Sequence, residues 1–232
     1  MATSAKWTAG LGVQTVASTV VGLVFFGVLL FVPAGTLAYW QAWVFIAVFM
    51  VATVVPSAYL AVRSPAALRR RMHGGPFAET RTIQKAVIWG TMLTVVAGLV
   101  VSALDHRFGW SSVPTGVVVL GNVLVAAGLG VAQFVVIQNA FAAATITVET
   151  GQPVVTTGLY AIVRHPMYVG ALVMIIGMPL ALDSYWGLLA LAPGVLALGI
   201  RIVDEEKMLA EQLAGYREYM QQVRYRLVPH VW

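Results

Sequence analysis

The residues of this sequence that are best suited to chemistry lie in its C-terminal third. Arg164 and His165 stand directly before Pro166, which suits the first turn of a helix because its missing N–H costs least there. A cation and an imidazole beside a helix N-terminus favour an anionic group such as a carboxylate. The alternative interpretation is an arginine that anchors the chain to lipid phosphate and a histidine that caps the helix.

A second group of ionisable residues, Asp204–Glu206, stands at the end of the last apolar segment. Three consecutive carboxylates at the mouth of a membrane helix would ordinarily form a solvated face. The apolar segments Tyr168–Leu182 and Tyr185–Ile202 are separated by only two residues, which predicts an antiparallel helical hairpin. Such a hairpin would bring the carboxylates to the membrane face of Arg164–His165, and charges paired within a membrane bundle indicate a functional site.

The composition requires a membrane. Of 232 residues, 59% are hydrophobic and 10% are charged, and the mean hydropathy is +0.85. Soluble domains carry roughly 25% charged residues. The long apolar runs favour helices over a barrel. We therefore expect an all-α, polytopic integral membrane bundle with about six transmembrane helices and a C-terminal amphipathic helix. The expected spans are Val13–Val32, Tyr39–Val62, Ala86–Leu104, Thr115–Phe134, Tyr168–Leu182 and Tyr185–Ile202.

The composition shifts near Ala140, which suggests two portions of one integrated domain. Residues 1–140 would be a four-helix transmembrane portion, and residues 141–232 a cofactor-binding catalytic portion with the hairpin and a cytoplasmic tail. Within the tail, Met208–Met220 has an amphipathic pattern that predicts a helix lying on the bilayer, with Tyr216 and Tyr219 at the level of the lipid headgroups.

Basic residues gather in alternate loops, so the positive-inside rule predicts that both termini of this multi-pass protein face the cytoplasm. We expect the membrane to be a prokaryotic inner or plasma membrane. The segment between the second and third spans alone holds Arg63, Arg69–Arg71, Arg81 and Lys85. The net charge of +5 reflects this topology and contact with membrane lipids, and we expect no nucleic-acid partner. The chain has no cysteine, which excludes disulfides, thiol catalysis and cysteine metal sites, and we expect no metal.

Several strings of the C-terminal third, in their order, resemble the isoprenylcysteine carboxyl methyltransferase family, which is similar to phospholipid methyltransferases. The resemblance covers about Val148–Pro229, and the earlier spans match only in being hydrophobic. The matching residues are Gly158-x-Tyr160, Arg164-His165-Pro166-x-Tyr168-x-Gly170, Glu205-Glu206, Gly215-Tyr216-x-x-Tyr219 and Arg226-Leu227-Val228-Pro229. The sequence departs from the family at Leu159, where proline is frequent, and it lacks a recognisable acceptor-specific segment.

The resemblance implies methyl transfer from S-adenosylmethionine to a lipophilic or lipidated acceptor, by analogy a carboxylate. The implied catalytic residues are Glu206, Arg226 and Arg164. The arginines would hold the acceptor carboxylate, and Glu206 or Glu205 would face the cofactor's cationic side or the reacting centre. The implied cofactor contacts are Val154, Val155, Gly158, Tyr160, His165, Pro166, Tyr168 and Glu205.

Two other classes of function fit the same sequence. A membrane reductase of the sterol-reductase type has a similar C-terminal region but binds NADPH; a 2′-phosphate-binding cluster and a longer bundle would favour it. A non-enzymatic transporter or scaffold would show polar residues midway through broken helices, whereas here they gather at one membrane face.

Overall fold

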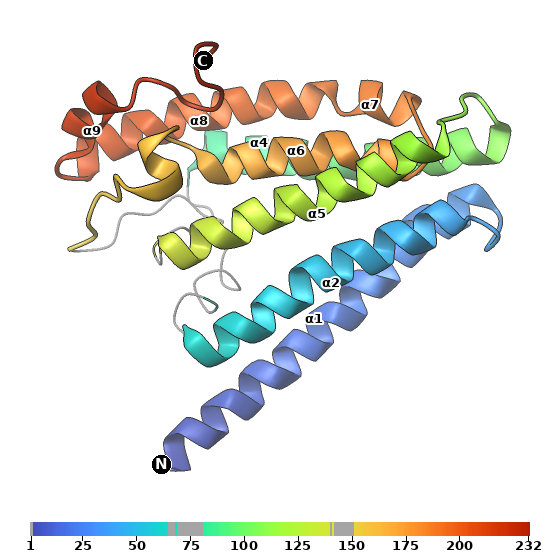
Figure 1. The fold of residues 1–232 in the computed structure, drawn as a ribbon, viewed down its shortest axis with the longest axis horizontal. Coiled ribbons are helices and arrows are strands. Elements are labelled where there is room, and N and C mark those ends of the chain that lie inside the picture. The colour runs from blue at the N-terminus through green and yellow to red at the C-terminus, as the bar shows by residue number, and fades with distance from the viewer. Residues whose placement is uncertain (1, 65–67, 69–80, 140, 142–150) are drawn as a thin grey trace.

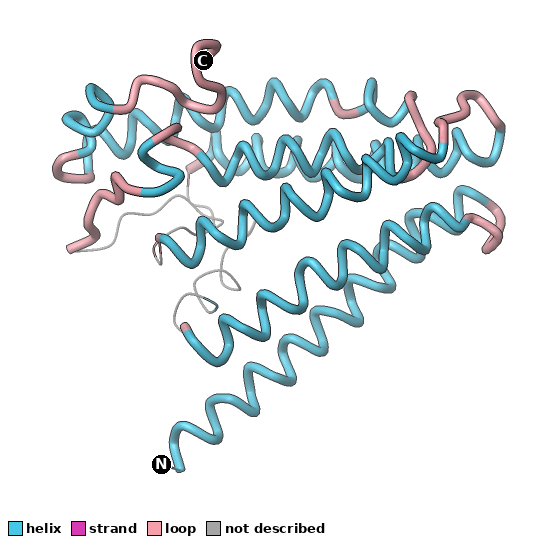
Figure 2. The backbone as a smooth tube through the Cα atoms, viewed as in Figure 1, coloured by secondary structure: helices cyan, strands magenta, loops and turns pink. Residues whose placement is uncertain are grey.

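The computed structural model is a bundle of helices, without strands among the residues it describes (Figures 1 and 2). These are residues 2–64, 68, 81–139, 141 and 151–232, with side chains from residue 15 onward. The elements are α1 (Ala2–Ala34), α2 (Trp40–Arg63), α4 (Thr82–Phe108), α5 (Thr115–Gln138), the short 3₁₀ helix η1 (Gly158–Ala161), α6 (Pro166–Ala181), α7 (Trp186–Ala190), α8 (Ala192–Gln212) and α9 (Tyr216–Gln222). The predicted polytopic, all-α membrane bundle is confirmed.

Five helical segments are long and apolar enough to cross a membrane: Thr15–Ala34, Trp40–Arg63, Thr82–Phe108, Thr115–Gln138 and Trp186–Gln212. The predicted fifth span corresponds to α6, which has 16 residues. At ~1.5 Å per residue α6 is shorter than the ~30 Å hydrocarbon layer of a typical bilayer. The predicted sixth span is two helices, because the chain breaks at Leu191 and α8 restarts with Pro193 in its first turn.

Glycines hold α6 tightly against α5. A Cβ added at Gly128 would overlap the carbonyl oxygen of Gly170, and one at Gly121 would overlap the backbone at Gly177 and Ala181. Both helices place these glycines seven residues apart, so the antiparallel backbones approach closely at two levels. Small residues commonly permit such packing in membranes. The seam fixes the start of α6 relative to the end of α5, where the functional residues gather.

A buried polar cluster closes the opposite end of the bundle. Asp105 accepts hydrogen bonds from the hydroxyls of Ser111 and Ser184, both at 2.6 Å, and Asp183 accepts one from Gln41 Nε2 at 2.9 Å. Asp105 and Ser184 are fully buried. The cluster joins the tight α6–α7 connection to α2 and α4, so it stabilises the predicted hairpin. This cluster was not predicted from the sequence.

The C-terminal tail differs from the prediction. α8 continues to Gln212, the chain turns at Gly215 with a φ of 83°, and α9 folds back against the end of the bundle. Tyr216 and Tyr219 are only 4% and 3% exposed, because they pack on protein side chains that include Leu213. Both rings therefore face protein, whereas the amphipathic pattern also allowed them to face the lipid headgroups.

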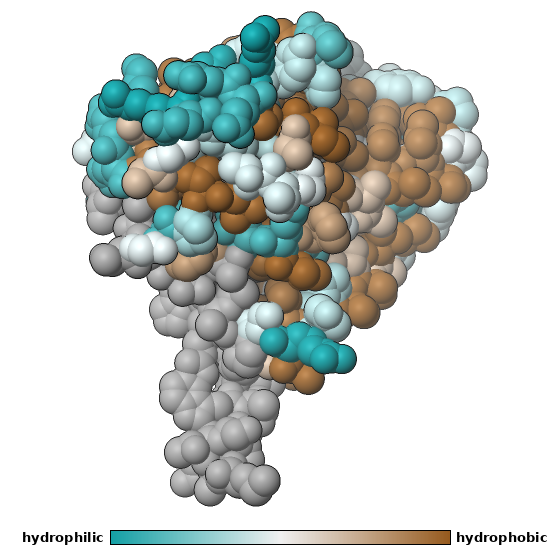
Figure 3. Space-filling view, turned by 60° about the vertical axis from the view of Figure 1, so that its left-hand side comes forward, coloured by the Kyte–Doolittle hydropathy of each residue, from teal (hydrophilic) through white to brown (hydrophobic). Residues whose placement is uncertain are grey.

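The start of α1, the end of α2, the end of α5 and α9 all lie toward one end of the molecule (Figure 1). Hydrophilic side chains gather at this end, beside a broad hydrophobic surface over the helices (Figure 3). This arrangement agrees with an even number of crossings. Arg69–Arg71, on which the predicted orientation partly depends, lie outside the described residues.

Candidate active site

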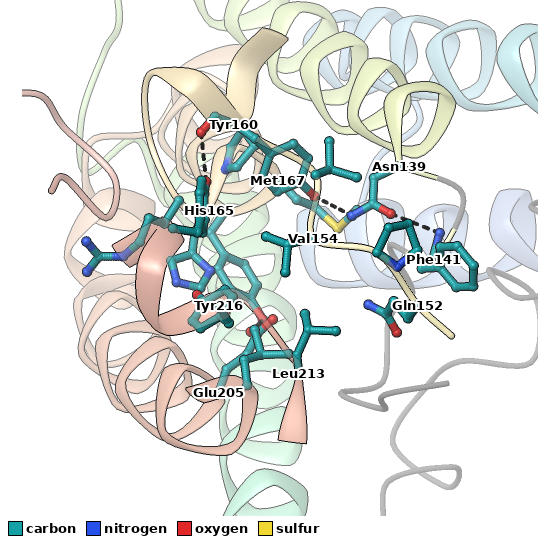
Figure 4. A pocket seen from close by; sticks show the side chains of 17 residues that line it. Asn139, Phe141, Gln152, Val154, Tyr160, His165, Met167, Glu205, Leu213 and Tyr216 are labelled. Carbon is teal, nitrogen blue, oxygen red and sulfur yellow. Dashed lines mark hydrogen bonds between the residues drawn. The ribbon is translucent and has the colours of Figure 1, made fainter. Parts of the chain in front are cut away.

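A cavity lies where α5 ends, α6 begins, and α8 and α9 meet (Figure 4). Its empty space amounts to about 790 Å³, part of which is continuous with open solvent. The lining residues are Asn139, Phe141, Gln152, Pro153, Val154, Val155, Tyr160, Arg164, His165, Pro166, Met167, Tyr168, Glu205, Leu209, Leu213, Tyr216 and Tyr219.

Glu206 is the centre of an ionic cluster beside this cavity. Its Oε1 accepts a hydrogen bond from Arg164 Nε at 2.6 Å and lies 3.1 Å from His165 Nε2, while its Oε2 accepts one from Arg226 Nε at 2.8 Å. The side chains of Glu206 and Arg164 are 4% and 5% exposed, and that of Arg226 is 30% exposed. The basic groups and Glu206 therefore meet at one end of the bundle, as the predicted hairpin requires.

Arg164 also ties down the C-terminal tail. Its Nη1 donates to the carbonyl oxygens of Val223 and Arg224 at 2.8 and 2.7 Å. The backbone N–H groups of Arg164 and His165 donate to the carbonyls of Tyr225 and Arg226 at 2.9 and 3.0 Å. These bonds join residues 59 to 61 positions apart in sequence. Arg164 therefore both fixes the position of the tail and lines the cavity.

Glu205 has a different environment from Glu206, although the two residues are neighbours on α8. Successive residues of a helix point about 100° apart. Glu205 lines the cavity, and its Oε2 accepts a hydrogen bond from Tyr168 Oη at 2.5 Å. Of the two carboxylates, Glu205 therefore faces the cavity, and Glu206 lies in the ionic cluster behind its wall.

Tyrosines form much of the cavity's polar wall. Tyr219 donates to the carbonyl of Tyr160 at 2.7 Å, and Asn139 Nδ2 donates to the Tyr160 hydroxyl at 3.2 Å. The buried hydroxyl of Tyr216 has no hydrogen-bond partner among the described residues. Burial, followed by the charges of Glu206 and Glu205, raises the pKa of the Tyr216 phenol, so it remains a neutral donor. A buried donor without a partner indicates a position where a ligand can bind.

Gly158 shapes the approach to η1. It has a φ of 59°, and a Cβ there would overlap the side-chain amide of Gln138. That amide donates to the carbonyl of Thr157 at 2.7 Å, and its oxygen accepts the N–H of Leu159 at 3.3 Å. The turn therefore requires glycine because the end of α5 fills the space beside it.

The structure brings most of the predicted site residues to the cavity. Those that line it are Val154, Val155, Tyr160, Arg164, His165, Pro166, Tyr168 and Glu205. Gly158, Glu206 and Arg226 are absent from the described lining: Gly158 forms the turn, and the other two belong to the ionic cluster.

Sequence analysis missed several lining residues. They are Asn139, Phe141, Gln152, Pro153, Met167, Leu209, Leu213, Tyr216 and Tyr219. Leu209, Leu213 and Tyr216 had a visible signal, because they share the apolar face of the amphipathic tail. That face was assigned to lipid, whereas it covers the cavity.

Residues 117–215 of this chain match the phospholipid methyltransferase family. The matched range runs from α5 to the turn before α9 and includes Glu205 and Glu206 of α8. The resemblance expected for the C-terminal third is confirmed and extends upstream over α5, while the tail beyond Gly215 lies outside the match. This region supports a membrane methyltransferase.

The mouse Delta(14)-sterol reductase TM7SF2 is also similar. The two sequences are 32% identical over 95 residues, which make up 38% of this chain and 22% of the reductase. The similarity therefore spans about a fifth of that relative's length.

Proposed function

We propose that this protein is an S-adenosylmethionine-dependent methyltransferase that methylates a lipophilic or lipidated carboxylate in the membrane. The observation that carries the proposal is the cavity within the family-matched region, lined by the carboxylate of Glu205, by tyrosines and by apolar side chains. The division at residue 140 into a transmembrane and a cofactor-binding portion remains part of this proposal.

The lining fits the chemistry of S-adenosylmethionine. Glu205 offers a carboxylate to a cationic group, and Tyr216 offers a buried hydroxyl without a partner among the described residues. Phe141, Val154 and Leu213 offer apolar surface to a nucleoside.

S-adenosylmethionine would supply an activated methyl group at this position. A carboxylate acceptor is already a nucleophile and needs little acid–base assistance, so the protein's contributions are alignment and a dry electrostatic environment. Glu205 would balance positive charge in the cavity. Glu206 would hold Arg164 and Arg226 in place rather than contact the reacting atoms.

Arg226 is the arginine best placed to hold the acceptor. Among the described residues, its Nε donates to Glu206, and its side chain is 30% exposed beside the cavity-lining Arg164 and His165. An arginine that remains partly accessible can grip a carboxylate through its outer nitrogens. The acceptor would then lie between the tail and the cavity mouth.

A membrane reductase is the second candidate, and the similarity to the mouse sterol reductase favours it. A reductase would bind NADPH in the same cavity. Isothermal titration of the purified protein with S-adenosylhomocysteine, with NADPH as comparator, separates the two functions. We expect saturable binding of S-adenosylhomocysteine and none of NADPH; the reverse result would establish the reductase, and binding of neither would refute both.

The same titration on two matched variants tests the site. Glu205→Gln removes the cavity carboxylate and is expected to weaken binding about tenfold or more, since a hydrogen bond to a charged group is worth about 1.5–3 kcal/mol. Glu218→Gln makes the same chemical change on the exposed side of α9 and should leave binding unchanged. Equal affinities of the unaltered protein and both variants would show that Glu205 is not part of the ligand site.

A further inference from the structure

A continuous chain of hydrogen bonds leads from Glu205 into the interior of the bundle. Tyr168 Oη donates to Glu205 and accepts a hydrogen bond from Arg201 Nε at 2.9 Å. Arg201 Nη1 donates to Gln84 Oε1 at 3.0 Å, and Gln84 Nε2 donates to Asp204. This hydrogen-bond chain thus connects the cavity with α4 and α8, through residues more than 100 positions apart in sequence.

The donors and acceptors of this chain can be arranged in one direction only. A guanidinium has donors and no acceptor, so the Tyr168 oxygen must accept from Arg201. The single phenolic proton is therefore directed to Glu205 Oε2. The other oxygen of Glu205 is left for the cavity, and the carboxylate keeps one orientation.

The free-energy cost of burying the charged Arg201 side chain indicates that this arrangement contributes to function rather than to stability alone. Arg201 is 8% exposed and Gln84 is fully buried, on helices that are otherwise apolar enough to span a membrane. A buried cation loses hydration, and an apolar side chain of similar volume would usually be at least as stabilising. The outer end of the chain is secured by Arg81 Nη2, which donates to Asp204 at 2.7 Å.

We propose that Arg201 is a positioning residue for the ligand site, which acts through Tyr168 to orient the carboxylate of Glu205. Arg201 is not among the described residues that line the cavity, and its hydrogen bond to Tyr168 connects it to Glu205. Gln84 and Asp204 hold the guanidinium in register with the phenol. This inference rests on the proposed function for the identity of the ligand, but the orientation of Glu205 is independent of it.

The test is a double-mutant cycle with two readouts. Tyr168→Phe, Arg201→Gln and the double variant are titrated with S-adenosylhomocysteine, and the carboxylate infrared band of Glu205 is assigned by difference from Glu205→Gln. Each single variant is expected to weaken binding on the order of tenfold. Since Arg201 acts through Tyr168, the dissociation constant of the double variant should lie within about twofold of that of Tyr168→Phe. The Glu205 band should shift in the same direction in all three variants.

Arg217→Gln is the matched control, because Arg217 is exposed and its Nε donates to the carbonyl of Ala210, which is not part of the hydrogen-bond chain. Arg201→Lys replaces Arg201→Gln if the latter fails to fold; it keeps the charge and should still shift the Glu205 band. Losses that multiply in the double variant, or an unshifted band in the arginine variants, would overturn the proposal. If the unaltered protein binds no S-adenosylhomocysteine, the proposed function fails, and the infrared comparison alone decides the role of Arg201.

Discussion

At the residue scale, Glu205 and Glu206 are adjacent in sequence and have different surroundings. Glu206 is bound by Arg164 at 2.6 Å and by Arg226 at 2.8 Å, and its side chain is 4% exposed. Removal of its charge leaves a buried arginine uncompensated, and breaking a buried ion pair typically costs 3–5 kcal/mol. We therefore expect Glu206→Gln to lower the free energy of unfolding by about 3 kcal/mol, measured by denaturation in detergent.

Glu205→Gln is the comparison for this prediction, because Glu205 faces the cavity. We expect it to lose affinity for the ligand while its unfolding transition stays near that of the unaltered protein. A Glu206→Gln variant as stable as the unaltered protein would show that the ionic cluster does not hold the tail.

Tyr216 offers a residue-scale test in which stability and binding change in opposite directions. Its hydroxyl is buried without a partner among the described residues, and a buried unsatisfied polar group costs about 1–3 kcal/mol. Tyr216→Phe should therefore stabilise the ligand-free protein while it weakens S-adenosylhomocysteine binding. Thermal unfolding with and without ligand measures both effects. A variant that loses stability and keeps its affinity would show that the hydroxyl has a partner within the protein.

At the element scale, the hairpin of α6 and α7–α8 could be predicted from sequence because a two-residue gap leaves adjacent apolar segments no other arrangement. The packing of α9 against the bundle could not be predicted from sequence. An apolar helix face has the same pattern whether it covers lipid or protein, and Tyr216 and Tyr219 cover protein. The partners of Arg201 were also beyond sequence reasoning, because Gln84 lies on a helix far away in the chain.

The glycine seam between α5 and α6 gives a prediction at this scale. A Cβ at Gly128 would overlap the backbone at Gly170 and Met174, whereas one at Gly130, on the same helix, would meet no atom within 4 Å. We expect Gly128→Ala to destabilise the protein by about 1–3 kcal/mol through overpacking. It should also weaken ligand binding, because the seam positions the start of α6.

Gly130→Ala is the matched control for the seam, and it should be neutral or slightly stabilising, since alanine favours helices over glycine by about 1 kcal/mol. Thermal unfolding in detergent compares the two variants. Equal stabilities would mean that the helices separate easily enough to admit a methyl group, and the seam would then not position the site.

At the scale of the whole molecule, composition alone was sufficient to predict a helical membrane bundle, because so few charges cannot cover a water-exposed surface. The number of spans was harder to specify. α6 falls short of a bilayer's hydrocarbon thickness and the last span is broken at Leu191, since prolines at positions 166, 179 and 193 restart or end helices within apolar runs. Hydropathy alone does not reveal such interruptions.

The orientation of the molecule in the membrane is the last expectation to be tested. The basic loops predict that the cavity and α9 lie on the cytoplasmic side, where a water-soluble cofactor is available. Since the chain has no cysteine, single cysteines report position without background. Glu218→Cys on α9 and Ser112→Cys between α4 and α5 are both exposed sites at opposite ends of the bundle. In intact cells, a membrane-impermeant maleimide should label Ser112→Cys at once and Glu218→Cys only after permeabilisation. Labelling in the opposite order would place the cavity outside the cytoplasm, and a cytosolic methyl donor could not reach it.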